Sequence, residues 1–186
     1  MEDEIIEIQT RALFRLRPKL DVYLPEFKVT VVYPIAVKKY ISWISPETGE
    51  VTGKRLSPKR GRPSDILPEL YSIRDKIGEP NLRLCIVFLT RHDSRLLSGN
   101  TDGGKRHGAV TVEGVPTEFE GLMYINGKAD IAKLIPPELS ETFTMRDFMK
   151  ATRLSGKKAW FALKTLVDTG AVSEAGMNKS AKIYKI

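Results

Sequence analysis

The sequence predicts an α+β fold in which a mixed α/β domain over residues 1–125 precedes a small domain over residues 126–186. Two observations lead to this prediction. In the first part, segments of strand character alternate with amphipathic helical segments, which is typical of an α/β sheet with one antiparallel part. The last part instead contains a short helix, a tight turn, a longer basic helix and then a hairpin.

The elements of the first part follow from the spacing of apolar and β-branched residues. Strands are expected at residues 5–10, 28–33, 39–44 and 82–89, with a return strand near 50–52. Helices are expected at residues 10–20, 65–77 and 129–135, the first interrupted near Arg17 by Pro18. Residues 91–108 are rich in Gly, Ser, Asn and Asp, and they are expected to form a flexible loop.

The last part carries capping signals in the order of a winged helix-turn-helix. Thr144 and Asp147 have the spacing of a capping box, and Phe143 precedes the cap as a hydrophobic staple. Ser155 can cap the second helix, and Gly170 is placed to end it. A fold with this order most often places one helix in a groove of DNA.

The second helix of this motif divides into two sides. The buried side is expected to comprise Ala159, Leu163, Leu166 and Val167. The outward side is expected to comprise Lys157, Lys158, Phe161, Lys164 and Thr165. Lys179 lies in the turn of the hairpin, at the tip of the wing. The lysines suit contacts with DNA phosphates, while a solvated lysine face on a dimerisation domain, and hence a homodimer, is the alternative.

Charge and composition narrow the class of protein. The net charge is +7, and eleven basic and six acidic residues lie from Asn126 onward, so nucleic acid is the partner we predict. No apolar run is long enough to span a membrane, and the acidic N-terminus does not resemble a signal peptide. The one cysteine, Cys85, lies in an apolar run, which fits a reducing cytoplasm. His92 and His107 lack zinc-ligand spacing.

A basic loop over residues 54–63 is the second candidate DNA contact, through Lys59, Arg60 and Arg62. The loop could bind a phosphate backbone, or its arginines could make structural bonds where the loop leads into a helix. Residues 60–63, Arg-Gly-Arg-Pro, also match the centre of an AT-hook, whose arginines enter a narrow minor groove.

Two further sites are suggested by residues on strands. Glu7 and Gln9 share one face of the first strand, and a carboxylate beside a polar group is half of a metal-dependent phosphodiesterase site. The alternative is an edge strand with its polar residues outward. Tyr33, with Lys38 and Lys39, follows the end of an expected strand, where α/β sheets often place their sites, although a core tyrosine with two surface lysines explains the same pattern.

Taken in order, four segments resemble a bacterial family of restriction-endonuclease-like proteins of the PD-(D/E)XK superfamily that carry a C-terminal winged helix. The segments are IIEIQT at 5–10, VTVVYPIAVKKYISWI at 29–44, SPKRGRPSDILPELYSIR at 57–74 and FTMRDFMKATRLSGKKAWFALKTLVDTGAV at 143–172. The resemblance implies a restriction-endonuclease-like mixed sheet, with Glu7 as the metal-binding carboxylate and Gln9 at the position of the catalytic lysine.

The chain departs from that pattern in two ways. Gln9 carries no positive charge, and only four residues precede the strand that contains Glu7, so the first helix and the Asp-bearing hairpin of the nuclease core are missing. We therefore expect a DNA-binding protein whose nuclease-like domain is degenerate or incomplete. The alternatives are an active nuclease that uses Mg²⁺, the one cofactor implied, and a protein–protein interaction module.

Overall fold

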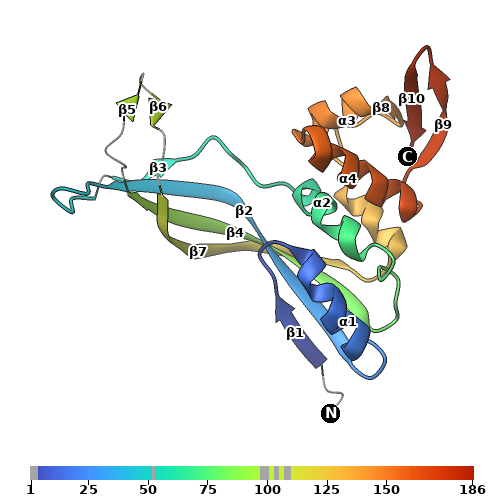
Figure 1. Cartoon of the computed structure of the whole chain (residues 1–186), viewed down its shortest axis with the longest axis horizontal. Helices are drawn as coiled ribbons and strands as arrows, with labels where there is room; N and C mark the ends of the chain where they lie inside the picture. Colours follow the sequence, from blue (N-terminus) through green and yellow to red (C-terminus); the bar gives the residue numbers. More distant parts are fainter. Residues whose placement is uncertain (1–3, 52, 97–100, 103–104, 107–109) are drawn as a thin grey trace. The chain divides into compact units, whose positions relative to one another are not determined.

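The computed structural model describes residues 4–51, 53–96, 101–102, 105–106 and 110–186 (Figure 1). The chain forms two compact units. The first, here called the helical unit, contains Met1–Pro34, Arg62–Ile86 and Leu122–Ile186. The second, the strand unit, contains Ile35–Gly61 and Val87–Gly121. The fold is of mixed α and β content, with one mixed sheet and a separate small sheet.

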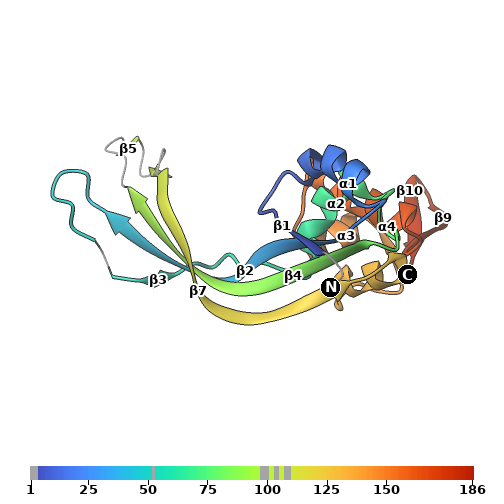
Figure 2. The same ribbon diagram turned by 90° about the horizontal axis from the view of Figure 1, so that it is seen from below.

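The large sheet has the strand order β1-β2-β4-β7. These strands are β1 (Glu4–Ile8), β2 (Lys28–Ile44), β4 (Leu82–Leu96) and β7 (Val110–Ile125). β1 pairs in parallel with β2, so that Glu7 lies opposite Val31. β4 runs in the same direction as β2, whereas β7 runs in the opposite direction (Figure 2). The sheet is therefore mixed, as the sequence predicts.

In the helical unit, helices cover one face of this sheet (Figure 2). The helical segments before the small sheet are η1 (Leu13–Leu16), α1 (Arg17–Tyr23), η2 (Pro63–Ile66), α2 (Leu67–Leu70), η3 (Tyr71–Ile73) and η4 (Lys128–Leu134). The core lies between helices and sheet, where Leu13, Leu20, Ile66, Leu70 and Ile86 are almost fully buried. Burying such side chains stabilises the fold by about 1.5–3 kcal/mol each.

The last elements form the small sheet and two helices. They are β8 (Thr142–Thr144), α3 (Met145–Thr152), α4 (Gly156–Asp168), β9 (Ser173–Asn178) and β10 (Ala181–Lys185). The strand order is β8-β10-β9, and both pairings are antiparallel. α4 also packs against α2, which comes from the middle of the chain. The two helices and the hairpin expected in the last part of the chain are thus present.

The strand unit contains the distal parts of β2, β4 and β7, together with short strands. These are β3 (Arg55–Leu56), which pairs with β2, and the hairpin of β5 (Thr101–Asp102) and β6 (Lys105–Arg106).

None of the helices that the structure describes is long and apolar enough to cross a bilayer.

Several predicted boundaries are wrong. The strands expected at 28–33 and 39–44 are one strand, and β4 continues to Leu96 through part of the expected loop. The rest of that loop contains β5 and β6, while residues 97–100, 103–104 and 107–109 lie outside the described residues. The return strand near 50–52 is a single bridge between Ile44 and Val51. The helix expected at 65–77 consists of η2, α2 and η3.

Candidate nucleic-acid interface

The first helix of the C-terminal motif begins at the predicted capping box. The Thr144 hydroxyl accepts a hydrogen bond from the Asp147 backbone N–H, and the Asp147 carboxylate accepts one from the Thr144 backbone N–H at 2.9 Å. The Phe143 ring stacks on Phe148 with 6.1 Å between ring centroids, as a staple does. The hydrogen bonds and the proximity of Arg146 and Lys150 lower the pKa of Asp147. α3 is therefore fixed at its N-terminus by local contacts.

The turn from α3 to α4 is tight and uses left-handed backbone conformations. Arg153 has a φ of 58° and Gly156 a φ of 53°. The Thr152 hydroxyl donates to the Phe148 carbonyl and accepts from Leu154 N–H at the start of the turn. Ser155 occupies the N-cap position, but its side chain makes no capping hydrogen bond, so that detail of the prediction is wrong.

α2 and η3 cover one side of α4. Thr165 is fully buried, and its hydroxyl donates to the Leu67 carbonyl at 3.1 Å. The Phe161 ring packs on Tyr71 with 4.6 Å between centroids. Thr165 therefore does not belong to the outward side where the sequence placed it, and Phe161 is engaged within the protein. Since both contacts link distant parts of the chain, helical periodicity alone could not reveal them.

The exposed side of α4 is a ridge of residues three or four apart. Lys157 is exposed, Trp160 is 47% exposed, and Lys164 and Asp168 complete the ridge. The sequence did not single out Trp160, although its position between Lys157 and Lys164 at helical spacing is the signal that places it there. Lys158 is also exposed but lies close enough to Asp65, near α2, to influence that carboxyl group.

Asp168 is balanced by two cations. Lys164 Nζ lies 2.7 Å from Asp168 Oδ1, and Arg74 Nε lies 2.7 Å from Asp168 Oδ2. The hydrogen bond from Lys164, followed by that from Arg74, lowers the pKa of Asp168. Because the carboxylate stays ionised with two cations beside it, the C-terminal end of the ridge carries an excess of positive charge.

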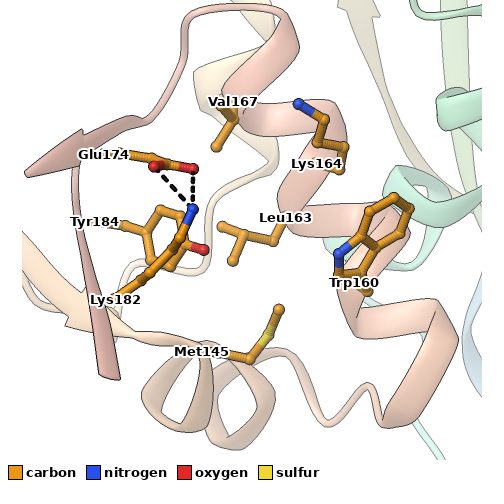
Figure 3. A pocket seen from close by; sticks show the side chains of 8 residues that line it. All are labelled: Met145, Trp160, Leu163, Lys164, Val167, Glu174, Lys182 and Tyr184. Carbon is orange, nitrogen blue, oxygen red and sulfur yellow. Dashed lines mark hydrogen bonds and ion pairs between the residues drawn. The ribbon is translucent and has the colours of Figure 1, made fainter. Parts of the chain in front are cut away.

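A groove of about 310 Å³ separates this ridge from the hairpin (Figure 3). Its lining combines apolar and charged side chains: Met145, Trp160, Leu163, Lys164, Val167, Glu174, Lys182 and Tyr184. Lys182 Nζ binds both carboxylate oxygens of Glu174 at 3.0 Å across the hairpin. Lys179, with a φ of 54°, is exposed in the turn that follows β9. The groove therefore has lysines on both of its walls.

The residues of the basic loop have different surroundings. Arg62 Nη1 donates to Glu138 Oε1 at 2.8 Å and to the Ala151 carbonyl at 2.7 Å, which ties the start of η2 to the end of α3. This is the structural alternative stated for the loop, and it removes Arg62 from the candidate DNA contacts. Lys59 and Arg60 belong to the strand unit and are exposed.

The two residues proposed for catalysis make local contacts. Glu7 Oε1 lies 2.7 Å from Lys19 Nζ, and Gln9 Nε2 donates to the Arg11 carbonyl at 2.8 Å. The ion pair with Glu7 raises the pKa of Lys19. Within the part of the chain that the structure describes, His, Cys, Asp and Glu form no group of three or more that could hold a metal ion. The exposed lysines described above lie on α4 and the hairpin, whereas the carboxylate of Glu7 is paired with Lys19.

Comparison with known proteins gives a family but no activity. Residues 1–126 match the family described as a domain of unknown function, DUF8091. The chain belongs to this family. It is also 28% identical over 182 residues to an uncharacterized protein of Treponema pallidum (strain Nichols), a match that covers 97% of this chain and 70% of that protein. No solved structure matches the chain significantly.

Proposed function

We propose that this protein binds DNA through the surface formed by α4 and the β9–β10 hairpin, as a winged helix does. The observation that carries the proposal is the ridge of Lys157, Trp160 and Lys164, which is exposed while α2 and α3 hold the opposite side of the helix. The order β8-α3-α4-β9-β10 and the strand order β8-β10-β9 support the assignment to the winged-helix class.

In this proposal α4 enters the major groove and the hairpin follows the neighbouring backbone. Lysines at both places would neutralise phosphates and release counterions, which fixes the position of the protein on the duplex but reads little sequence. Arginine and amide side chains recognise bases through paired hydrogen bonds, and the described residues of the ridge include none of these side chains. We therefore expect the protein to bind DNA with weak sequence preference. The large sheet, in the same proposal, derives from a nuclease-like core in which the uncharged Gln9 stands at the position of the catalytic lysine.

The test is a double variant of the ridge, Lys157→Gln with Lys164→Gln, titrated with duplex DNA at several salt concentrations. Removing two lysine–phosphate pairs should lower affinity and reduce the slope of log K against log salt by about 1.8, since each pair contributes about 0.9. Fluorescence anisotropy of a labelled duplex measures both quantities.

Lys128→Gln with Lys133→Gln is the matched control on η4. It removes the same charge, and Lys133 pairs with Asp130 at 2.7 Å much as Lys164 pairs with Asp168. The control should bind nearly as the unaltered protein does. The proposal is refuted if both variants lose affinity equally, or if the unaltered protein fails to bind DNA even at low salt, which would leave the protein-interaction alternative.

A further inference from the structure

A second cationic surface lies in the strand unit, around the buried carboxylate of Asp93. Asp93 lies on β4, and only 2% of this residue is exposed to solvent. Arg91 Nε lies 2.6 Å from Asp93 Oδ1, while Lys39 Nζ and Arg95 Nη2 lie 3.5 Å and 3.7 Å from Asp93 Oδ2. Alternate residues of a strand share a face, so Arg91, Asp93 and Arg95 all come to the same side of β4.

This face carries more positive than negative charge. Within the described part of the chain, three cations share this one carboxylate, which gives a balance of two positive charges. Arg55 adds a further cation, because it lies directly opposite Ile41 in the pairing of β2 with β3, and Ile41 shares a face with Lys39. We call the set of Lys39, Arg55, Arg91 and Arg95 the Asp93 face.

The cations are held in place but still reach solvent. The side chains of Lys39, Arg91 and Arg95 are 27, 40 and 29% exposed. Arg95 also lies over the Trp43 ring, at 5.9 Å from its centroid. The buried carboxylate and the ring restrict these long side chains before any ligand arrives, which lowers the entropy cost of binding an anion. Arginine heads arranged in this way suit the bidentate recognition of phosphate.

The opposite face of the same strands is neutralised internally. Lys38 Nζ lies 2.9 Å from Glu120 Oε1, and Glu120 also accepts a hydrogen bond from the Thr90 hydroxyl. These two bonds lower the pKa of Glu120, which therefore remains a partner for Lys38. Farther along, Ser42 is hydrogen-bonded to His92 at 2.9 Å. On this face, the lysine of β2 thus has a carboxylate partner of its own, unlike the cations that share Asp93.

We propose that the Asp93 face binds the phosphate backbone of nucleic acid, as a second contact that is separate from α4. The inference rests on the proposed DNA-binding function and names a further surface for the same partner. A backbone fits better than a single small anion because four cations from β2, β3 and β4 form a row across neighbouring strands. Successive phosphates can engage such a row, whereas one phosphate can engage only part of it.

The two tryptophans of the chain allow the two surfaces to be observed separately, because Trp43 lies on the Asp93 face and Trp160 on α4. In the Trp160→Phe protein, fluorescence reports on Trp43. In the Trp43→Phe protein, it reports on Trp160. Titration with a short random-sequence duplex should change the emission of each single-tryptophan protein with saturable binding.

Charge variants in the Trp160→Phe background test which residues bind the phosphates. Lys39→Gln with Arg95→Gln leaves the 2.6 Å pair of Arg91 and Asp93 in place, and a thermal melt checks that the variant is folded. At 0.1 M salt we expect affinity to fall roughly eightfold for each phosphate that no longer has a cationic partner. Lys38→Gln, on the opposite face one residue away, should change affinity less than twofold.

The possible results separate this inference from the proposed function. If Trp43 emission does not respond and Lys39→Gln with Arg95→Gln binds normally while Trp160 responds, the inference is wrong and the proposed function stands. If Trp43 responds but the α4 variants bind normally, the Asp93 face stands alone. If inorganic phosphate at equal ionic strength reproduces the Trp43 change, the face is a simple anion site and the backbone proposal is wrong.

Discussion

Substitution of Gly61 by alanine distinguishes a structural role of the Arg-Gly-Arg-Pro segment from that of a DNA hook. Gly61 lies against β2 and donates its backbone N–H to the Ala36 carbonyl at 2.9 Å. A Cβ at this position would lie 2.5 Å from Ile35 Cγ2 and 2.6 Å from the Ala36 oxygen. Gly61 is therefore packed on the sheet too closely for a side chain at this position.

The loss of stability that Gly61→Ala should cause follows from these distances. Carbon atoms prefer separations of about 3.5–4.0 Å, so the loop or the strand would have to move by about 1 Å. Overpacking of this kind costs about 1–3 kcal/mol, and weakening the hydrogen bond to Ala36 adds about 1 kcal/mol. We expect Gly61→Ala to lower the free energy of unfolding by about 2–4 kcal/mol.

Urea unfolding followed by circular dichroism measures this loss as a lower midpoint at an unchanged slope. Gly53→Ala is the control in the same loop, because a Cβ added there would meet no atom within 4 Å. It should change the free energy of unfolding by less than about 1 kcal/mol. A Gly61→Ala protein of full stability but weakened DNA binding would refute the structural role and favour the minor-groove hook.

Two further predictions concern single side chains of the helical unit. Thr144→Ala removes one half of the capping box and should lower the free energy of unfolding by about 1 kcal/mol. Thr142→Ala, on the exposed part of β8, should leave the free energy of unfolding nearly unchanged. Equal losses of stability for the two variants in thermal melts would contradict the role of the cap. Burial, and then the charges of Glu69 and Asp65, raise the pKa of Tyr33 from 10.0 to about 12. Between these values the unfolded chain has lost the proton that the folded protein keeps, so stability should fall by about 1.4 kcal/mol per pH unit. Tyr33→Phe should make the decline measured by urea unfolding from pH 10 to 12 shallower by that amount, and an unchanged decline would argue against this cause.

The elements that could be predicted from the sequence are those with local causes. The capping box of Thr144 and Asp147, the staple of Phe143 and the end of α4 at Gly170, with its φ of 79°, each depend on residues a few positions apart. Local hydrogen bonds and backbone preferences decide such features, and they do not change with the surroundings.

The features that were missed depend on contacts between distant residues. β2 continues through Pro34, where a strand end was expected, because β1 pairs with β2 only as far as Val32 and so requires no N–H from Pro34. Thr165 lies on α4 between the buried side and the outward side of the helix, and it is buried only because α2 packs against it. Likewise, Arg62 finds its partners 76 and 89 residues away.

The Asp93 face shows an error of a different kind. The alternation Arg91-x-Asp93-x-Arg95 is visible in the sequence and places three charges on one side of a strand. The abundance of Gly, Ser and Asn after residue 96 led to a loop prediction that began too early, at residue 91. This boundary error therefore concealed a cluster of charges that strand geometry would have brought together.

The hydrogen bond from Thr165 to the Leu67 carbonyl limits how this protein can be dissected. A fragment that begins at residue 126 would contain α3, α4 and the hairpin but not α2, so the part of α4 that packs on α2 would face water. The helix that carries the lysine ridge therefore depends on a segment from the middle of the chain for its packing. Any truncation or fusion that separates residues 67–70 from α4 removes the contacts that α2 makes with this helix. The lysine surface can therefore be transferred to another protein only together with the middle of the chain.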